Sequence, residues 1–156
     1  MSKSLGNSLP ARMLDYLHVG NSQRDNTVIF LLTSDPSGFP HVALLSPFQV
    51  VTTSDREFLL AVHKGTNSQR YLDESRKATL IIQASPSVDY VKFQPEKVEG
   101  WVSKKDEVLY RAKPVDVLED YSEMAPYISQ LKFDPKEILE DYSAGFEEIK
   151  EYITSH

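Results

Sequence analysis

The chain of 156 residues contains no cysteine, and this absence removes several kinds of chemistry. Disulfide cross-links, zinc sites built on thiolates and cysteine nucleophiles are all excluded. Basic residues are in the minority, because 17 Lys and Arg stand against 23 Asp and Glu and the net charge is −6. A nonspecific nucleic-acid binder needs a basic face to neutralise phosphates, so we expect no nucleic-acid partner.

Long apolar runs are also missing from the sequence. No stretch approaches the roughly 20 apolar residues that a membrane-spanning helix requires. The first residues, MSKSLGNS, lack the apolar segment of a secretory signal. We therefore expect a cytoplasmic protein without a membrane partner. The length and the hydrophobic fraction of 40% predict that residues 1–156 form a single domain.

Short apolar and β-branched segments dominate the first two thirds of the chain, which is typical of strands. The segment 39–51 is long for a strand and contains Pro47, so we expect a bend there. The polar run TTSDR between two apolar runs predicts a hairpin. The predicted strands are residues 27–33, 39–51, 58–63, 78–84, 90–93 and 98–102, and the last two are expected to pair.

Helical spacing of apolar residues marks both ends of the chain. Pro10 followed by Met13, Leu14 and Leu17 predicts a short helix that ends near Val19. Strands first and helices later predict an α+β fold, mainly antiparallel β, with a closed or half-closed barrel over roughly residues 8–104. A helical extension is expected over roughly residues 105–156. The predicted helices after the barrel cover residues 106–112, 115–121, 124–131 and 135–142, and an amphipathic helix carries Phe146, Ile149 and Ile153.

The segment 64–70 is the strongest candidate for a binding site. Lys64, Gly65 and three small polar residues follow a predicted strand and precede a short helix over residues 67–74. A glycine next to the start of a helix exposes main-chain N–H groups and a positive dipole end, which suit a phosphate. An ordinary loop with a helix cap explains the same residues. The P-loop signature GxxxxGK[ST] is absent.

Other polar and aromatic residues give weaker signals. His41 and His63 are possible metal ligands, but no third ligand has suitable spacing, so we expect no metal site. Ser46 lacks the G-x-S-x-G surroundings of a nucleophile. Large rings such as Tyr90 and Trp101 most often serve as core or interface residues.

Three segments in sequence, DPSGFPHVALLSPFQV, FLLAVHKGTNSQRYL and ATLIIQ, resemble the pyridoxamine 5'-phosphate oxidase-like family of FMN-binding split barrels. The resemblance covers roughly residues 8–104 and implies a split β-barrel of Greek-key type. It places Asp35, Gly38, Pro40 and His41 in a turn before the strand that follows the flavin. It also places residues 43–46 opposite the isoalloxazine ring.

The resemblance assigns the FMN phosphate to the residues that begin the helix after the next strand. Asn67 and Ser68 stand where members of the family carry Arg or Lys, so neutralisation of the phosphate falls to Lys64 and Arg70. Trp101 is a candidate to face the cofactor or the dimer seam. The expected cofactor-binding residues are Leu44, Leu45, Ser46, Val62, His63, Lys64, Thr66, Asn67, Ser68, Arg70 and Trp101.

The function implied is that of a homodimeric FMN flavoprotein, an oxidoreductase that passes hydride from a reduced nicotinamide or another small donor through FMN. The chain ends in GFEEIKEYITSH, which does not match the Trp and Arg-x-His segment of the true oxidases, so pyridoxamine phosphate oxidation is not assigned. No catalytic residue is identified. The alternatives are a flavin- or haem-binding sensing module without turnover and a structural dimer with an empty groove.

Overall fold

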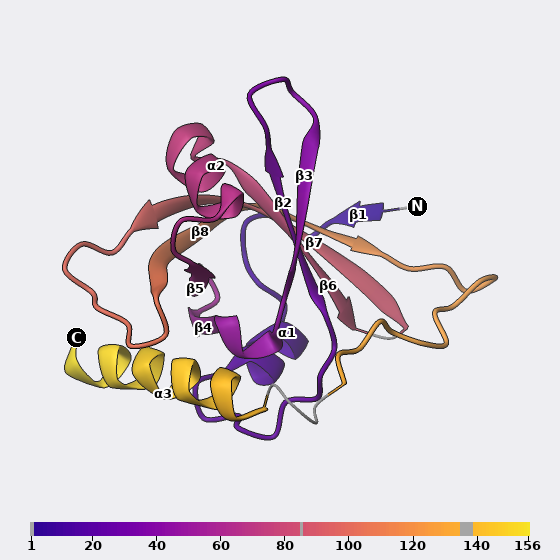
Figure 1. The fold of residues 1–156 in the computed structure, drawn as a ribbon. Coiled ribbons are helices and arrows are strands. Elements are labelled where there is room, and N and C mark those ends of the chain that lie inside the picture. Colours follow the sequence, from indigo (N-terminus) through magenta and orange to yellow (C-terminus); the bar gives the residue numbers. More distant parts are fainter. Residues whose placement is uncertain (1, 85, 135–138) are drawn as a thin grey trace.

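The computed structural model describes residues 2–84, 86–134 and 139–156 as eight antiparallel strands with helices at three places (Figure 1). The sheet order is β3-β2-β6-β7-β8-β5-β4, and β1 adds to β8. The strands are β1 Ser2–Ser4, β2 Ile29–Ser34, β3 Pro40–Leu45, β4 Val50–Ser54, β5 Glu57–His63, β6 Ala78–Ala84, β7 Ser87–Lys97 and β8 Glu107–Asp120. The α-helices are α1 Ala11–Leu17, α2 Asn67–Ser75 and α3 Leu139–Ser155, and η1 Pro47–Gln49 is a 3₁₀ turn.

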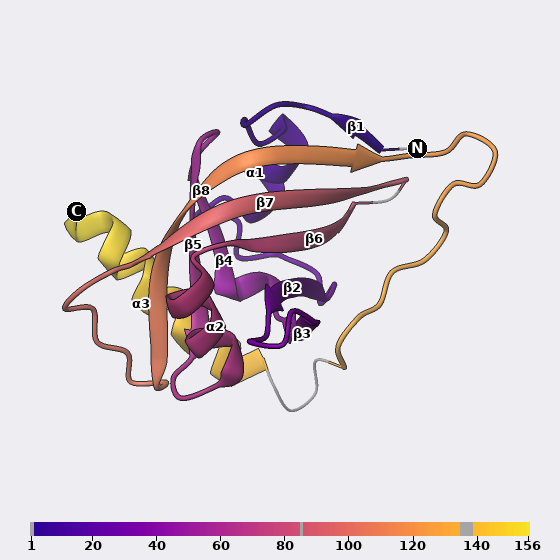
Figure 2. The same ribbon diagram turned by 90° about the horizontal axis from the view of Figure 1, so that it is seen from above.

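The sheet curls into a barrel that is not hydrogen-bonded along its whole circumference. β3 and β4 lie at opposite ends of the strand order, yet only Ser46 and the three residues of η1 separate them in the chain. These four residues cannot span a flat sheet of this width. The two edge strands, β3 and β4, therefore approach each other. Figure 2 shows the strands wrapping in this way, with α2 beside the place where the two edges approach each other. The predicted half-closed antiparallel α+β barrel is confirmed.

Two apolar clusters stabilise the fold on the two sides of the sheet. The barrel interior is filled by side chains such as Leu31, Leu60 and Val91, with Met13 and Leu17 of α1 closing one end. The second cluster lies under α3, where Phe146 and Ile149 pack on the neighbourhood of Phe48 and Leu109. Because Leu109 faces α3 while its neighbours Val108 and Tyr110 face the barrel, the start of β8 is buried on both sides. α3 therefore covers the start of β8 from outside the barrel.

The predicted bend at Pro47 is confirmed and has a local cause. Ser46 caps η1, because its hydroxyl accepts from the Phe48 N–H and the Gln49 side chain accepts from the Ser46 N–H. This reciprocal cap turns the chain between β3 and β4. The predicted strand over 27–33, the hairpin of β4 and β5, and the short helix at 67–74 are confirmed as well.

Two predicted helices, over residues 106–112 and 115–121, are wrong, because these residues form the single strand β8. β8 pairs with β7 along most of its length and with β5 at its start, and this pairing outweighs the local helical spacing. Pro114 is accommodated where the register shifts between Lys92 and Phe93, since a bulge needs fewer ladder hydrogen bonds. The sheet thus continues to Asp120.

Further corrections concern residues 98–102 and 124–131. Residues 98–102 form no strand, and Gly100 instead adopts a left-handed conformation (φ 78°) in the turn after β7. Residues 124–131 form no helix but an extended segment that returns to β2, where Leu131 accepts from the Val28 N–H. Much of the predicted helix at 135–142 lies outside the described residues. The final amphipathic helix is confirmed as part of α3.

Candidate functional site

The turn between β5 and α2 is fixed by its own side chains. Thr66 is the N-cap of α2, where its hydroxyl accepts from the Gln69 N–H (3.3 Å) and donates to the His63 carbonyl (2.8 Å). The Gln69 side chain reaches back to accept from the Gly65 N–H (2.7 Å), while Gly65 has a φ of 77°. The alternative interpretation of Thr66 as a helix cap is therefore correct as far as its side chain is concerned.

The same cap leaves three main-chain donors without an intramolecular acceptor among the described residues. Lys64, Gly65 and Gln69 have intramolecular acceptors for their N–H groups, but within the described residues those of Thr66, Asn67 and Ser68 have none. They lie at the N-terminus of a helix of nine residues, where the helix dipole is positive. The start of α2 thus retains the donors that an anion needs.

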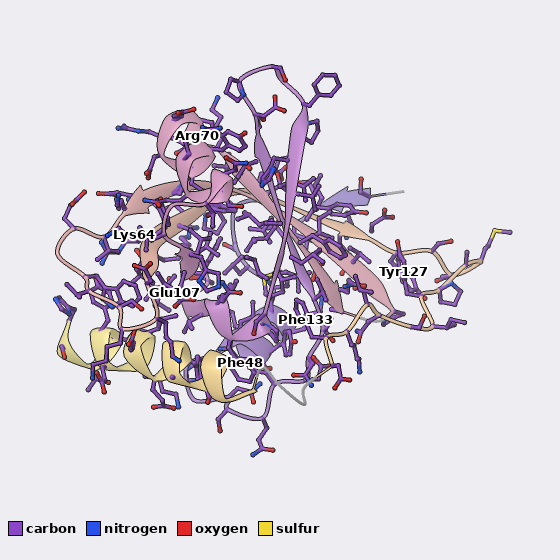
Figure 3. All side chains as sticks on the ribbon, viewed as in Figure 1. Phe48, Lys64, Arg70, Glu107, Tyr127 and Phe133 are labelled. Atoms are coloured by element: carbon purple, nitrogen blue, oxygen red, sulfur yellow. The ribbon has the colours of Figure 1, made fainter. Side chains whose placement is uncertain are left out.

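Two cations flank these donors. Lys64 is exposed, and within the described part of the chain its ammonium group forms no ion pair. Arg70 lies one helical turn further on and donates to the Tyr71 hydroxyl (3.1 Å), with its guanidinium 5.0 Å from the centre of the Tyr71 ring. Figure 3 shows Lys64 at the end of β5 and Arg70 on α2. Lys64 is thus the more readily available cation.

His41 is a site residue that sequence reasoning left out of the cofactor set. Its Nε2 lies 3.4 Å from the Ser68 hydroxyl, and its ring packs edge-on against Tyr71 (5.2 Å between centroids). The buried Ser68 hydroxyl therefore joins β3 to the first turn of α2. The DPSGFPHV motif located His41 on β3, but only the curl of the barrel brings that strand against α2.

Of the residues expected beside a flavin ring, Leu44 is exposed on β3, whereas Leu45 and Val62 point into the barrel core. Ser46 is buried and its hydroxyl accepts the Phe48 N–H. Leu45 and Val62 can thus contact a ligand through their main chain only.

The remaining two expected residues, His63 and Trp101, lie near the start of β8. His63 is exposed and stands opposite Glu107 in the register of β5 and β8, and the Lys64 N–H donates to the Asp106 carbonyl (2.8 Å). Burial raises the pKa of the Glu107 carboxyl, the nearby His63 lowers it, and Glu148 raises it further. Trp101 lines a groove between the β7–β8 loop and α3 rather than the turn at Lys64.

The outer face of the sheet carries an apolar stripe that is half-buried on β2 and β6 and exposed on β3. Phe30 and Leu32 of β2 alternate with interior residues and stand opposite Leu44 and Val42 of β3. Val42 is 52% exposed and Leu44 is 51% exposed. Ile81 of β6 continues the stripe beside Phe30. A contiguous apolar patch on the outside of a protein usually marks a surface that binds a partner or a ligand.

Neither a family model nor a curated protein matches this sequence. Solved structures do match its fold. A candidate pyridoxamine 5'-phosphate oxidase from Lactobacillus delbrueckii has a TM-score of 0.58 at 14% identity, over 74% of this chain and 98% of its own. An FMN-binding protein from Syntrophomonas wolfei has a TM-score of 0.52 at 12% identity, over 78% and 89%. PhzG from Burkholderia lata, in complex with tetrahydrophenazine-1-carboxylic acid, has a TM-score of 0.52 at 13% identity, over 70% and 84%.

These similarities define the class of fold. The chain has the split-barrel fold of the pyridoxamine 5'-phosphate oxidase-like proteins, as its sequence motifs predicted. Within the described residues, no helix combines the length and apolar character needed to cross a bilayer. The same residues contain no group of three or more metal-ligating side chains arranged to hold an ion.

Proposed function

We propose that the protein binds FMN and works as a flavin-dependent oxidoreductase in a homodimer. The observation that carries this proposal is the first turn of α2, where the N–H groups of Thr66, Asn67 and Ser68 lack acceptors among the described residues, beside a Lys64 that forms no ion pair with them. A phosphate monoester is the part of FMN that such a turn recognises. Two split-barrel neighbours support the assignment, namely the FMN-binding protein and PhzG in complex with tetrahydrophenazine-1-carboxylic acid.

The residues at the start of α2 would bind the phosphate mainly through main-chain N–H groups and less through side-chain charge. Asn67 and Ser68 supply N–H groups, Lys64 supplies an exposed ammonium group, and the Ser68 hydroxyl lies beside the His41 imidazole. Arg70 reaches the same anion only if it leaves the Tyr71 ring and hydroxyl. We therefore assign the larger electrostatic contribution to Lys64 and the smaller to Arg70.

The apolar stripe on β2, β3 and β6 supports the proposed homodimer. Leu44 belongs to this stripe and also to the expected ring-contact residues, so a second copy packed on the stripe would enclose a planar ligand laid along β3. A two-fold interface buries the same patch on both subunits, which suits a stripe whose β3 side chains are exposed. Oligomeric state measured by analytical ultracentrifugation tests this step, and Leu44→Glu is expected to shift the dimer toward monomer.

When bound, FMN supplies hydride and electron transfer, which the side chains of this protein cannot perform themselves. The chain provides position and exclusion of water. Leu44 and the neighbouring apolar stripe present an apolar surface to the flavin ring. The cap at Thr66 holds the phosphate-binding amides in place before FMN binds. No side chain is assigned as a proton donor or acceptor.

The direct experiment is a visible spectrum of the purified protein, titrated with FMN and then treated anaerobically with NADH or NADPH. Saturable flavin binding followed by bleaching supports the oxidoreductase. Binding without bleaching by these or other small donors supports the second candidate, a flavin- or haem-binding sensing module. The absence of side-chain charge at Asn67 and Ser68 favours that candidate, because it weakens the grip on the phosphate. No binding at millimolar FMN would remove the flavin from the proposal.

A further inference from the structure

A second binding surface lies in the groove between the β7–β8 loop and α3. Its volume is about 550 Å³, within the range of about 300 to 1,000 Å³ that is usual for small-molecule sites. The residues that give it chemical character are Glu99, Trp101, Glu147, Glu148, Glu151 and Tyr152. The groove thus combines aromatic walls with carboxylates.

The aromatic walls are held in place by the apolar cluster under α3, by β8 and by His156, another lining residue. Trp101 and Tyr152 are half-buried and pack against the apolar cluster under α3. The Tyr152 hydroxyl accepts from Arg111 of β8 (2.9 Å), and the Tyr152 ring stacks on His156 at 4.4 Å between centroids. The faces of anchored rings are electron-rich and attract cations within about 6 Å.

The charge of the groove is predominantly negative. Four glutamates line it, and Lys104 is the one Lys or Arg among the lining residues of the described chain. Glu147 is neutralised in part by Lys150 (2.8 Å), whereas the exposed Glu151 forms no ion pair within the described residues. A ligand in this groove is therefore surrounded by negative potential.

Glu148 supplies an independent indication of a missing donor. Its Oε1 accepts from the Lys104 N–H (2.9 Å), but its Oε2 is buried and has no hydrogen-bond partner among the described residues. A buried carboxylate oxygen without a donor is costly, by about 1–3 kcal/mol or more. Glu148 is one of the residues that line the groove, so a cation that enters it lies beside this carboxylate.

We propose that the groove binds an organic ammonium ion whose body is aromatic or aliphatic. The ammonium group lies among Glu148, Glu151 and the ring faces, and the apolar body packs on Trp101. Carboxylates and aromatic faces both favour a cation, and the same arrangement repels an anion. The site is independent of the proposed flavin site, because none of its contacts involves the start of α2.

Trp101 is the single tryptophan of the protein, so its fluorescence reports on this groove directly. The full-length, flavin-free protein is titrated with three probes of similar shape, namely phenethylamine, 2-phenylethanol and 3-phenylpropionate. We expect a saturable change with phenethylamine, at least tenfold weaker binding of the neutral alcohol, and no binding of the anion. Equal binding of the amine and the alcohol would overturn the proposal. The same holds if the amine does not saturate the protein up to about 50 mM, which corresponds to a very weak affinity.

Charge variants locate the bound ammonium group. The double variant Glu148→Gln/Glu151→Gln is expected to weaken phenethylamine binding about tenfold while leaving the affinity for 2-phenylethanol unchanged. Glu123→Gln, an exposed position outside the groove, serves as the matched control and should bind the amine as the native protein does. Circular dichroism confirms that each variant folds. An unchanged amine affinity in the folded double variant would contradict the assignment, whatever the outcome of the FMN titration.

Discussion

The turn at the start of α2 and the groove under α3 lie at the same end of β5 and β8, where the Lys64 N–H donates to the Asp106 carbonyl, yet they suit opposite charges. The turn offers main-chain N–H groups, whose direction is set by the backbone. The groove offers side-chain carboxylates and rings, whose identity is set residue by residue. A site built from the main chain tolerates substitutions such as Asn67 and Ser68, whereas a site built from side chains changes with each one.

The largest expected effect concerns the residue that holds α3, one wall of the groove, in place. The buried Arg24 donates to the carbonyls of Leu17, His18, Asn21, Pro47 and Val50, and its guanidinium lies 4.7 Å from the Phe146 ring. Arg24→Met leaves these carbonyls without their donor and should lower the free energy of unfolding by about 3 kcal/mol. Urea denaturation measures the change. The exposed Arg56→Met is the control, and equal stability of the two variants would show that Arg24 does not hold α3.

The second test separates the two sites by ligand. Lys64→Ala should weaken FMN about tenfold, roughly 1.4 kcal/mol, because the ammonium group neutralises the phosphate. Riboflavin, which lacks the phosphate, should bind this variant and the native protein equally. Arg70→Ala should have a smaller effect in the same direction, since Arg70 already contacts Tyr71. Equal losses for FMN and riboflavin, measured by fluorescence titration, would reject the phosphate assignment.

The third test compares two glycines. Gly65 in the turn and Gly100 in the β7–β8 loop have left-handed φ values of 77° and 78°, and an added Cβ would meet nothing within 4 Å at either position. Alanine at either position should therefore cost about 1 kcal/mol of stability from backbone strain alone. We expect Gly65→Ala to weaken FMN as well, and Gly100→Ala to leave FMN affinity unchanged. A loss of FMN affinity in both variants would show that the two sites are coupled.

The smallest expected effect concerns pH. Burial, and to a lesser degree Glu148, raises the pKa of Glu107 above its ordinary value of 4.5. The folded protein therefore binds this proton more tightly than the unfolded chain, so stability falls as the pH rises from about 4.5 toward neutrality. Glu107→Gln should flatten that part of the profile, as measured by thermal unfolding between pH 4.5 and 7. A profile identical to that of the native protein would contradict the shift.

Sequence reasoning located the residues whose structure is decided locally. The turn at Pro47, the hairpin of β4 and β5 and the start of α2 depend on neighbours within a few residues, and each was predicted. β8 was mistaken for helices because both faces are apolar at its start, where Leu109 packs under α3 between the interior residues Val108 and Tyr110, and this hides the alternation of a strand there. His41 and Ser68 lie 27 residues apart, and only the closed sheet brings them together. The groove under α3 could not be predicted for the same reason.

The position of β8 between β7 and β5 also has a consequence during synthesis. β5 ends at His63, but its partner β8 begins only at Glu107. The ribosome therefore synthesises more than forty residues after β5 before the edge of β5 that faces β8 can be paired. In that interval an apolar strand with free N–H and C=O groups is open to association with other nascent chains. Slow elongation between these two strands would therefore prolong the period in which the protein is most prone to aggregate.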